Sequence, residues 1–143
     1  MTSLSSSNQW IEAISILNDL TQVGKVTWRV SSTTYVSPPR LGGLSLLGTP
    51  VKYVCHGAFE AAYNGKTFRL TKFNNPAATL LTGDGDNAYL YVLDLLSDGV
   101  EMYRVPVAAG LNDLYRSIQH QVAGVDDVLQ SLLGERDVLN SSQ

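Results

Sequence analysis

The dipeptide Asn64-Gly65 restricts the fold of this chain more than any other feature of its sequence. Asn-Gly is among the strongest signals for a two-residue turn between antiparallel strands, because both turn positions need a positive φ. Such a turn sets the cross-strand pairs, which include Phe59 with Leu70, Ala61 with Phe68, and Glu60 with Arg69. The apolar pairs share one face and the opposite charges lie on the other, so the sequence predicts a hairpin in a consistent register.

A second hairpin is predicted where residues 88–96 and 100–107 flank a turn at 97–99. The first arm is apolar on both faces, which is typical of a central strand covered on both sides. Asp94 interrupts this arm, and Arg104 is its nearest cross-strand partner in one register. Because a buried, paired carboxylate is more often structural than catalytic, we expect a structural pair here.

The N-terminal segment has the spacing of a helix. Trp10, Ile14 and Leu17 form an apolar stripe that a helix would turn towards a core. Polar residues at 6–8 suit the start of the helix, and Gly24 suits the left-handed residue that closes it. The sequence therefore predicts a helix that ends near Gly24.

Residues 26–36 follow this helix and alternate as expected of a strand, with Trp28 facing inward against the helix. The next segment, 37–50, is rich in proline and glycine, which disfavour regular pairing. It also carries four leucines, Leu41, Leu44, Leu46 and Leu47. These residues fit a ligand lid, a subunit arm or a disordered connection, and the sequence does not choose among the three.

The C-terminal segment, residues 110–135, again has helical spacing of its apolar residues. Gly124 lies in its middle and disfavours a continuous helix, so we expect either one kinked helix or two helices. Asp113, Arg116 and His120 share the polar face, and we expect them to form a solvated surface with a local ion pair.

Together these elements predict an α+β protein. We expect an N-terminal helix, an antiparallel meander of about five strands, and a C-terminal helix or helix pair broken near Gly124, with the helices on one face of the sheet. The 143 residues suit a single domain covering 1–143, with 1–6 and 135–143 as frayed tails.

The charge content argues against several classes of protein. Charged residues make up 16 % of the chain, below the usual quarter or so, which leaves part of the surface available to another chain. The net charge is −3 and the ten Lys and Arg are scattered, which disfavours nucleic-acid binding. We see no signal peptide, no apolar run of about 18 residues, and only one cysteine, so we expect a cytoplasmic protein without membrane contact.

The adjacent pair Cys55-His56 is the one place where the sequence suggests a nucleophile and a base. Neighbouring residues of a strand point to opposite faces, so His56 cannot easily serve Cys55. We expect Cys55 to be a small buried apolar residue. One cysteine and two histidines do not form a zinc site, and the sequence at 84–87 lacks the later ligands of a calcium loop. We therefore expect no metal and no cofactor.

These observations favour a non-catalytic binding protein that acts as a homo-oligomer and binds or inhibits a protein partner. The low charge, the leucines of segment 37–50 and the two-faced apolar strand support this hypothesis. Phosphate-loop, dinucleotide and nucleophile-elbow motifs are absent from the sequence, so we expect no enzymatic activity.

Two alternatives remain open. In the first, the oligomer sequesters a small anionic, nucleotide-like ligand in a pocket at a subunit boundary, because guanidinium groups hold phosphate and phenol rings stack on bases. The candidate ligand-binding residues are Arg40, Arg104, Tyr115 and Arg116. In the second, the chain is a small enzyme with a site around Asp94, His56 or His120.

Overall fold

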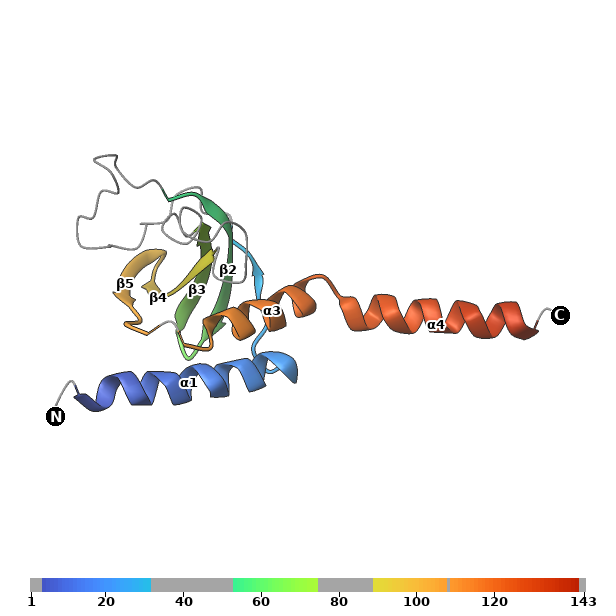
Figure 1. The fold of residues 1–143 in the computed structure, drawn as a ribbon, viewed down its shortest axis with the longest axis horizontal. Coiled ribbons are helices and arrows are strands. Elements are labelled where there is room, and N and C mark those ends of the chain that lie inside the picture. The colour runs from blue at the N-terminus through green and yellow to red at the C-terminus, as the bar shows by residue number, and fades with distance from the viewer. Residues whose placement is uncertain (1–3, 32–52, 75–88, 108, 142–143) are drawn as a thin grey trace, which may run out of the picture.

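The computed structural model describes residues 4–31, 53–74, 89–107 and 109–141. Along the chain they form α1 (Leu4–Gln22), β1 (Arg29–Val30), β2 (Cys55–Tyr63), β3 (Lys66–Asn74), β4 (Tyr89–Ser97), β5 (Val100–Arg104), α3 (Leu111–Val122) and α4 (Val125–Ser141). Figure 1 shows a curved sheet with α1 and α3 beside it and α4 extending away from it. The fold class is α+β, as predicted from the sequence.

The five strands form one sheet in the order β1-β2-β3-β4-β5, and every neighbouring pair is antiparallel. This is the predicted meander. Of the strand expected at 26–36, the described residues 26–31 contain β1 at Arg29 and Val30, and residues 32–36 lie outside the described part of the chain.

Both predicted hairpins are confirmed. Asn64 and Gly65 have φ angles of 54° and 80°, which are the left-handed values that their turn requires. All the predicted pairs of β2 with β3 are present, including Phe59 opposite Leu70 and Glu60 opposite Arg69. The turn between β4 and β5 is also left-handed, and β4 pairs with β3 on one side and β5 on the other.

The core lies between one face of the sheet and the helices α1 and α3. Its fully buried residues come from α1, from the strands and from α3, and they include Ile14, Leu70, Leu93, Leu114 and Ile118. The expected inward position of Trp28 is confirmed. Its side chain is buried in this core, and its indole N–H donates a hydrogen bond to the Thr21 hydroxyl over 3.0 Å.

Gln121, near the end of α3, forms hydrogen bonds with the connection between α1 and β1. Its side-chain amide donates hydrogen bonds to the carbonyls of Thr21 (3.0 Å) and Val26 (2.8 Å). Its amide oxygen accepts a hydrogen bond of 2.7 Å from the Trp28 backbone N–H. One side chain therefore bonds three backbone groups around the turn after α1, of which the Thr21 carbonyl also accepts a hydrogen bond from the Gly24 N–H.

The C-terminal region is a helix pair broken at the predicted glycine. Gly124 has φ of 64° and separates α3 from α4. Helix α4 continues to Ser141, so most of the segment 135–143 that the sequence predicted to fray is helical. No residue of α4 is buried, and Figure 1 shows the helix pointing away from the sheet.

Candidate functional site

Among the predicted ligand-binding residues that the structure describes, Arg104 is separated from Tyr115 and Arg116. Tyr115 and Arg116 are consecutive on α3, on the helix-covered side of the sheet. Arg104 is bonded to Asp94, which lies on the opposite face of the sheet, and Arg40 lies outside the described residues. Of the four, only Tyr115 and Arg116 are therefore shown to lie next to each other.

Tyr115 is the centre of an aromatic group. Its ring packs against the rings of Phe59 and Tyr91, with centroid separations of 5.3 Å and 5.2 Å. A β-bulge between Cys55 and Gly57 brings β2 close to α3, and a Cβ on Gly57 would lie 3.0 Å from the Tyr115 hydroxyl oxygen. The absence of a side chain at Gly57, whose φ of 156° also favours glycine, thus makes room for the phenol.

Lys72 on β3 adds a positive charge to this group. Its ammonium nitrogen lies 3.9 Å from the centroid of the Tyr89 ring and 5.5 Å from that of Tyr115. Both distances are within the range of cation–π attraction. His56 contacts the other side of this arrangement, since its ring meets Tyr89 edge-on with centroids 5.4 Å apart.

We call these residues the tyrosine–lysine cluster, comprising Cys55, His56, Lys72, Tyr89, Tyr91, Tyr115 and Arg116. Burial raises the pKa of Tyr115, and Tyr91 and Cys55 raise it further. Burial also raises the pKa of Tyr91, with Tyr89 adding to the rise and Arg116 opposing it. The two phenols are therefore protonated at neutral pH and can donate hydrogen bonds.

The sequence pointed to Tyr115 and Arg116 but missed Lys72, Tyr89 and Tyr91. One feature of the sequence could have indicated that Tyr89 and Tyr91 lie together. Tyr89 and Tyr91 are two residues apart on a strand and so lie on the same face. Lys72 is directly opposite Tyr91 in the sheet, and that register could not be known before β3 and β4 were paired.

The opposite face of the sheet carries a row of alternating charges. In register across all five strands lie Arg29, Glu60, Arg69, Asp94 and Arg104. The Arg104 guanidinium donates two hydrogen bonds to the Asp94 carboxylate, over 2.8 Å and 3.1 Å, and Arg69 donates one over 3.4 Å. The predicted partnership of Asp94 with Arg104 is thus confirmed.

We interpret the role of this charge row as structural. Asp94 is fully buried and the Arg69 side chain is 6 % exposed, so each charge depends on its neighbours. Hydrogen bonding to Asp94 is the main reason why the pKa of Arg104 is raised, which keeps this guanidinium charged and engaged. Arg104 is therefore occupied within the sheet and is not available to a ligand at the tyrosine–lysine cluster.

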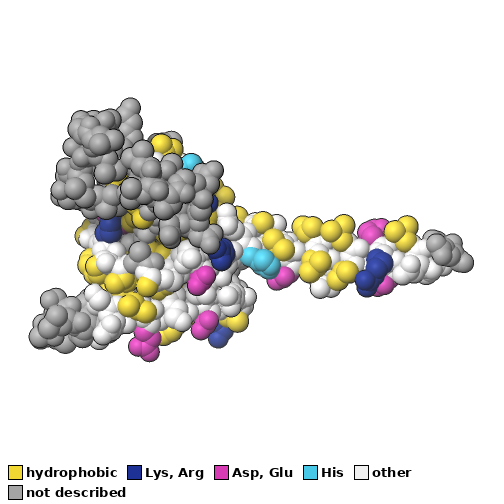
Figure 2. Space-filling view, viewed as in Figure 1, with side chains coloured by type: hydrophobic (Ala, Val, Ile, Leu, Met, Phe, Trp, Pro, Cys, Tyr) yellow, Lys and Arg dark blue, Asp and Glu magenta, His cyan; other side chains and the backbone are white. Residues whose placement is uncertain are grey.

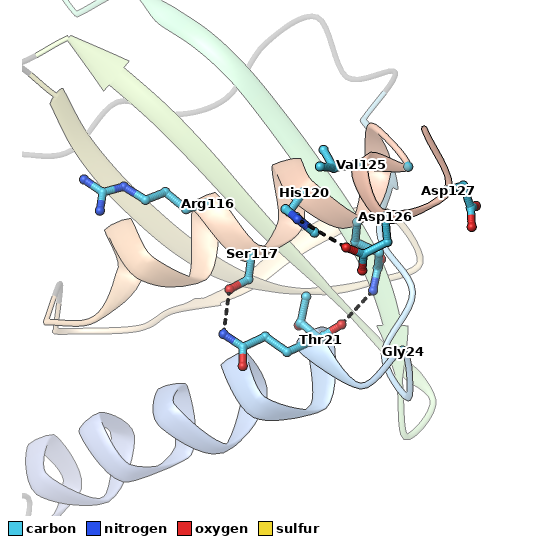
Figure 3. A pocket seen from close by; sticks show the side chains of 11 residues that line it. Thr21, Gly24, Arg116, Ser117, His120, Val125, Asp126 and Asp127 are labelled. Atoms are coloured by element: carbon cyan, nitrogen blue, oxygen red, sulfur yellow. Dashed lines mark hydrogen bonds and ion pairs between the residues drawn. The ribbon is translucent and has the colours of Figure 1, made fainter. Parts of the chain in front are cut away.

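A cavity of about 560 Å³ lies where α1, α3 and the start of α4 meet. Figure 3 shows His120 directed towards Asp126, with Nε2 and Oδ1 3.7 Å apart, while Arg116 extends away from this pair. The Gln22 side-chain amide donates a hydrogen bond of 3.3 Å to the Ser117 hydroxyl across the helices. His120 and Asp126 are both largely exposed, so this ion pair is a weak link between α3 and α4.

Two of the exposed apolar surfaces among the described residues could take a partner. The first is on α4, where Figure 2 shows hydrophobic side chains along the projecting helix. The second is a groove of about 250 Å³ between α1 and the first hairpin, lined by residues that include Trp10, Ile16, Tyr63 and Phe68. The groove is smaller than the 300–1,000 Å³ typical of small-molecule sites, and it matches an apolar side chain of a protein partner better.

The residues of the hypothetical small enzyme do not converge. Asp94 lies on the sheet face opposite to α3, so it cannot meet His120. The expectation that Cys55 is buried is wrong, because its thiol is exposed at the start of β2. Within the described ranges, no three side chains of His, Cys, Asp or Glu gather closely enough to hold a metal ion. The segment at 84–87 lies outside those ranges.

In the same part of the chain, no helix is both long and apolar enough to cross a membrane. No known family model, curated protein or solved structure is significantly similar to this chain.

Proposed function

We propose that this protein is a non-catalytic binding protein that acts as a homo-oligomer, in which α4 pairs with α4 of a second copy. The observation that carries the proposal is the exposure of α4, which has no buried residue over its 17 residues. An isolated helix of this length is marginal in water, so packing against a partner is needed to stabilise it.

The apolar residues of α4 form one stripe. Val125, Val128, Leu129, Leu132 and Leu139 are spaced by three, four or seven residues, and each is between 40 % and 66 % exposed. This spacing lines one side of a helix, as in helices that pair along a seam. Val138 is equally apolar but lies outside this stripe, about 120° around the helix from Leu132.

The charges of α4 favour an antiparallel pair. Arg136 lies within the stripe, and Asp126 lies at its edge near the other end of the helix. A parallel pair would place Arg136 against Arg136 of the second copy. An antiparallel pair would place each Arg136 beside the Asp126 of the other copy, which gives two attractive contacts instead of one repulsive contact.

We propose that the oligomer binds a protein partner. The groove beside α1 is the surface that we assign to a protein partner, because its apolar lining and small volume suit a single inserted side chain.

The separation of Asp94 from His120 supports the absence of catalysis at those residues. The single, exposed cysteine suits a reducing compartment, so we place the protein in the cytoplasm.

Sedimentation equilibrium of the full chain tests the pairing of α4. We expect an oligomer for the unchanged protein and for Val138→Asp, and a monomer for Leu132→Asp. Both substitutions put a carboxylate on an exposed position of α4, and only Leu132→Asp interrupts the stripe. A monomeric unchanged protein, or equal behaviour of the two variants, would show that α4 is not the seam.

Cysteine cross-linking tests the direction of the pair. In a Cys55→Ser background, chains carrying Asp126→Cys are mixed with chains carrying Arg136→Cys and oxidised. An antiparallel pair links the two different chains to each other. A parallel pair links each chain to its own kind, and this result would contradict the proposed arrangement while leaving the oligomer intact.

A further inference from the structure

We propose that the tyrosine–lysine cluster is a binding site for a small nucleotide-like anion, that is, an aromatic ring joined to a phosphate group. The site is separate from the α4 stripe and from the charge row. It lies at the end of the sheet where α3 covers β2, β3 and β4, and its residues come from all four of these elements.

The positive charge of the cluster is not neutralised by the described residues. Neither Lys72 nor Arg116 has a carboxylate within ion-pair distance in this part of the chain. The basic side chains of the charge row differ in this respect, since Arg29, Arg69 and Arg104 each contact an acid. The chain has a net charge of −3, yet Lys72 over the tyrosine rings and Arg116 next to Tyr115 on α3 both lack an acidic partner among the described residues.

The hydrogen-bonding groups of the cluster are also available. The hydroxyls of Tyr91 and Tyr115 make no hydrogen bond to another described residue. Both are protonated at neutral pH for the reasons given above, so each offers one O–H donor. One ammonium, one guanidinium and two phenols together form a donor set that suits phosphate oxygens.

The aromatic part of the ligand is assigned to Tyr89. Its ring is 38 % exposed, whereas Tyr115 is only 4 % exposed and serves mainly as the floor of the site. Lys72 sits over the Tyr89 ring and so places the positive charge next to the exposed aromatic surface. A ligand with phosphate and base joined would reach both features at once.

Calorimetric titration with adenosine monophosphate, in phosphate-free buffer, tests the site. Removing one charge-assisted hydrogen bond by Lys72→Gln should weaken binding by about tenfold or more. Lys66→Gln is the matched control, because Lys66 is an exposed lysine at the other end of the same strand. Tyr115→Phe removes only the hydroxyl and keeps the ring that packs in the core, so it should weaken binding without unfolding the protein.

Cys55 supplies an independent readout, since it is the only cysteine of the chain and its thiol is exposed. It belongs to the tyrosine–lysine cluster and lies two residues before Gly57, which is next to the Tyr115 hydroxyl. We expect saturating adenosine monophosphate to slow the alkylation of Cys55 by iodoacetamide, a small neutral reagent. The Lys72→Gln variant should show this protection only at higher ligand concentration.

Four outcomes would overturn the proposal in whole or in part. If adenosine monophosphate gave neither a heat of binding nor protection of Cys55 from alkylation, the proposed site would be wrong. Equal weakening by Lys72→Gln and Lys66→Gln would reduce the binding to general charge attraction. If inorganic phosphate bound as tightly as adenosine monophosphate, the assignment of an aromatic ring to the ligand would be wrong. If adenosine bound as tightly as adenosine monophosphate, the assignment of a phosphate group to the ligand would be wrong.

Discussion

Helices α3 and α4 follow one another in the chain and differ completely in their surroundings. Both have apolar residues at helical spacing, and only Ala123 and Gly124 separate them. Four residues of α3 are buried, against α1 and the sheet, and none of α4 is. Apolar spacing therefore defines a helix face that needs a partner, but it does not say whether the partner is the same chain or another one.

The largest expected difference concerns a single leucine on each helix. Leu114 is fully buried in the core, and Leu132 is 63 % exposed on α4. Leu114→Ala should lower the free energy of unfolding by about 2–5 kcal/mol. Leu132→Ala should change it by less than about 0.5 kcal/mol when the protein is dilute enough to be monomeric. Urea unfolding of both variants measures this, and equal losses would remove the distinction between the helices.

The second pair compares two glutamines. Gln121 on α3 satisfies three backbone groups around the first turn, whereas Gln130 on α4 is exposed. Gln121→Ala removes the partner of the Val26 carbonyl and of the Trp28 N–H and should cost about 2–3 kcal/mol. Gln130→Ala should be neutral or slightly stabilising, because alanine favours helix. Thermal unfolding distinguishes the two, and a neutral Gln121→Ala would mean that water replaces the amide at no cost.

The third pair uses two glycines to test the break between the helices. Gly124 has a left-handed φ of 64°, so Gly124→Ala should destabilise the protein by about 1–2 kcal/mol. Gly134 lies within α4, and an added Cβ would meet nothing within 4 Å. Gly134→Ala should therefore stabilise α4 by about 1 kcal/mol and increase its helicity. Circular dichroism during unfolding reports both, and changes of the same sign would contradict the broken helix pair.

The smallest effect should appear at alkaline pH. The pKa of Tyr115 is raised in the folded protein, mainly by burial, above the value of about 10 of an unfolded tyrosine. The contribution of this phenol to stability is therefore complete below about pH 10 and is lost as the pH rises through the folded pKa.

Unfolding by urea at several alkaline pH values checks this prediction. The unchanged protein should lose more stability above about pH 10 than Tyr115→Phe does. Tyr63→Phe serves as the control at an exposed tyrosine of β2. An identical pH dependence of Tyr115→Phe and the unchanged protein would show that the Tyr115 phenol is not responsible.

Local physical rules determined much of the fold from the sequence alone. Asn64-Gly65 requires left-handed backbone angles, and the alternation around it allows one register, so the first hairpin and its pairs were predictable. The break at Gly124 and the inward position of Trp28 follow from equally local preferences. The pairing of Asp94 with Arg104 was predictable because only one turn separates their strands.

Only the tertiary structure decided which side chains come together in the tyrosine–lysine cluster. Tyr115 and Arg116 were chosen from the sequence, but Lys72, Tyr89 and Tyr91 join them through the pairing of β3 with β4 and the packing of α3. Arg104 is removed from the site because its strand turns it towards the buried Asp94. The exposure of α4 could not be predicted from the sequence either, because a helix buried in a core has the same apolar spacing. Turns and periodicity are properties of neighbouring residues, whereas burial and the meeting of charges depend on distant segments, and these are positioned only when the whole chain packs.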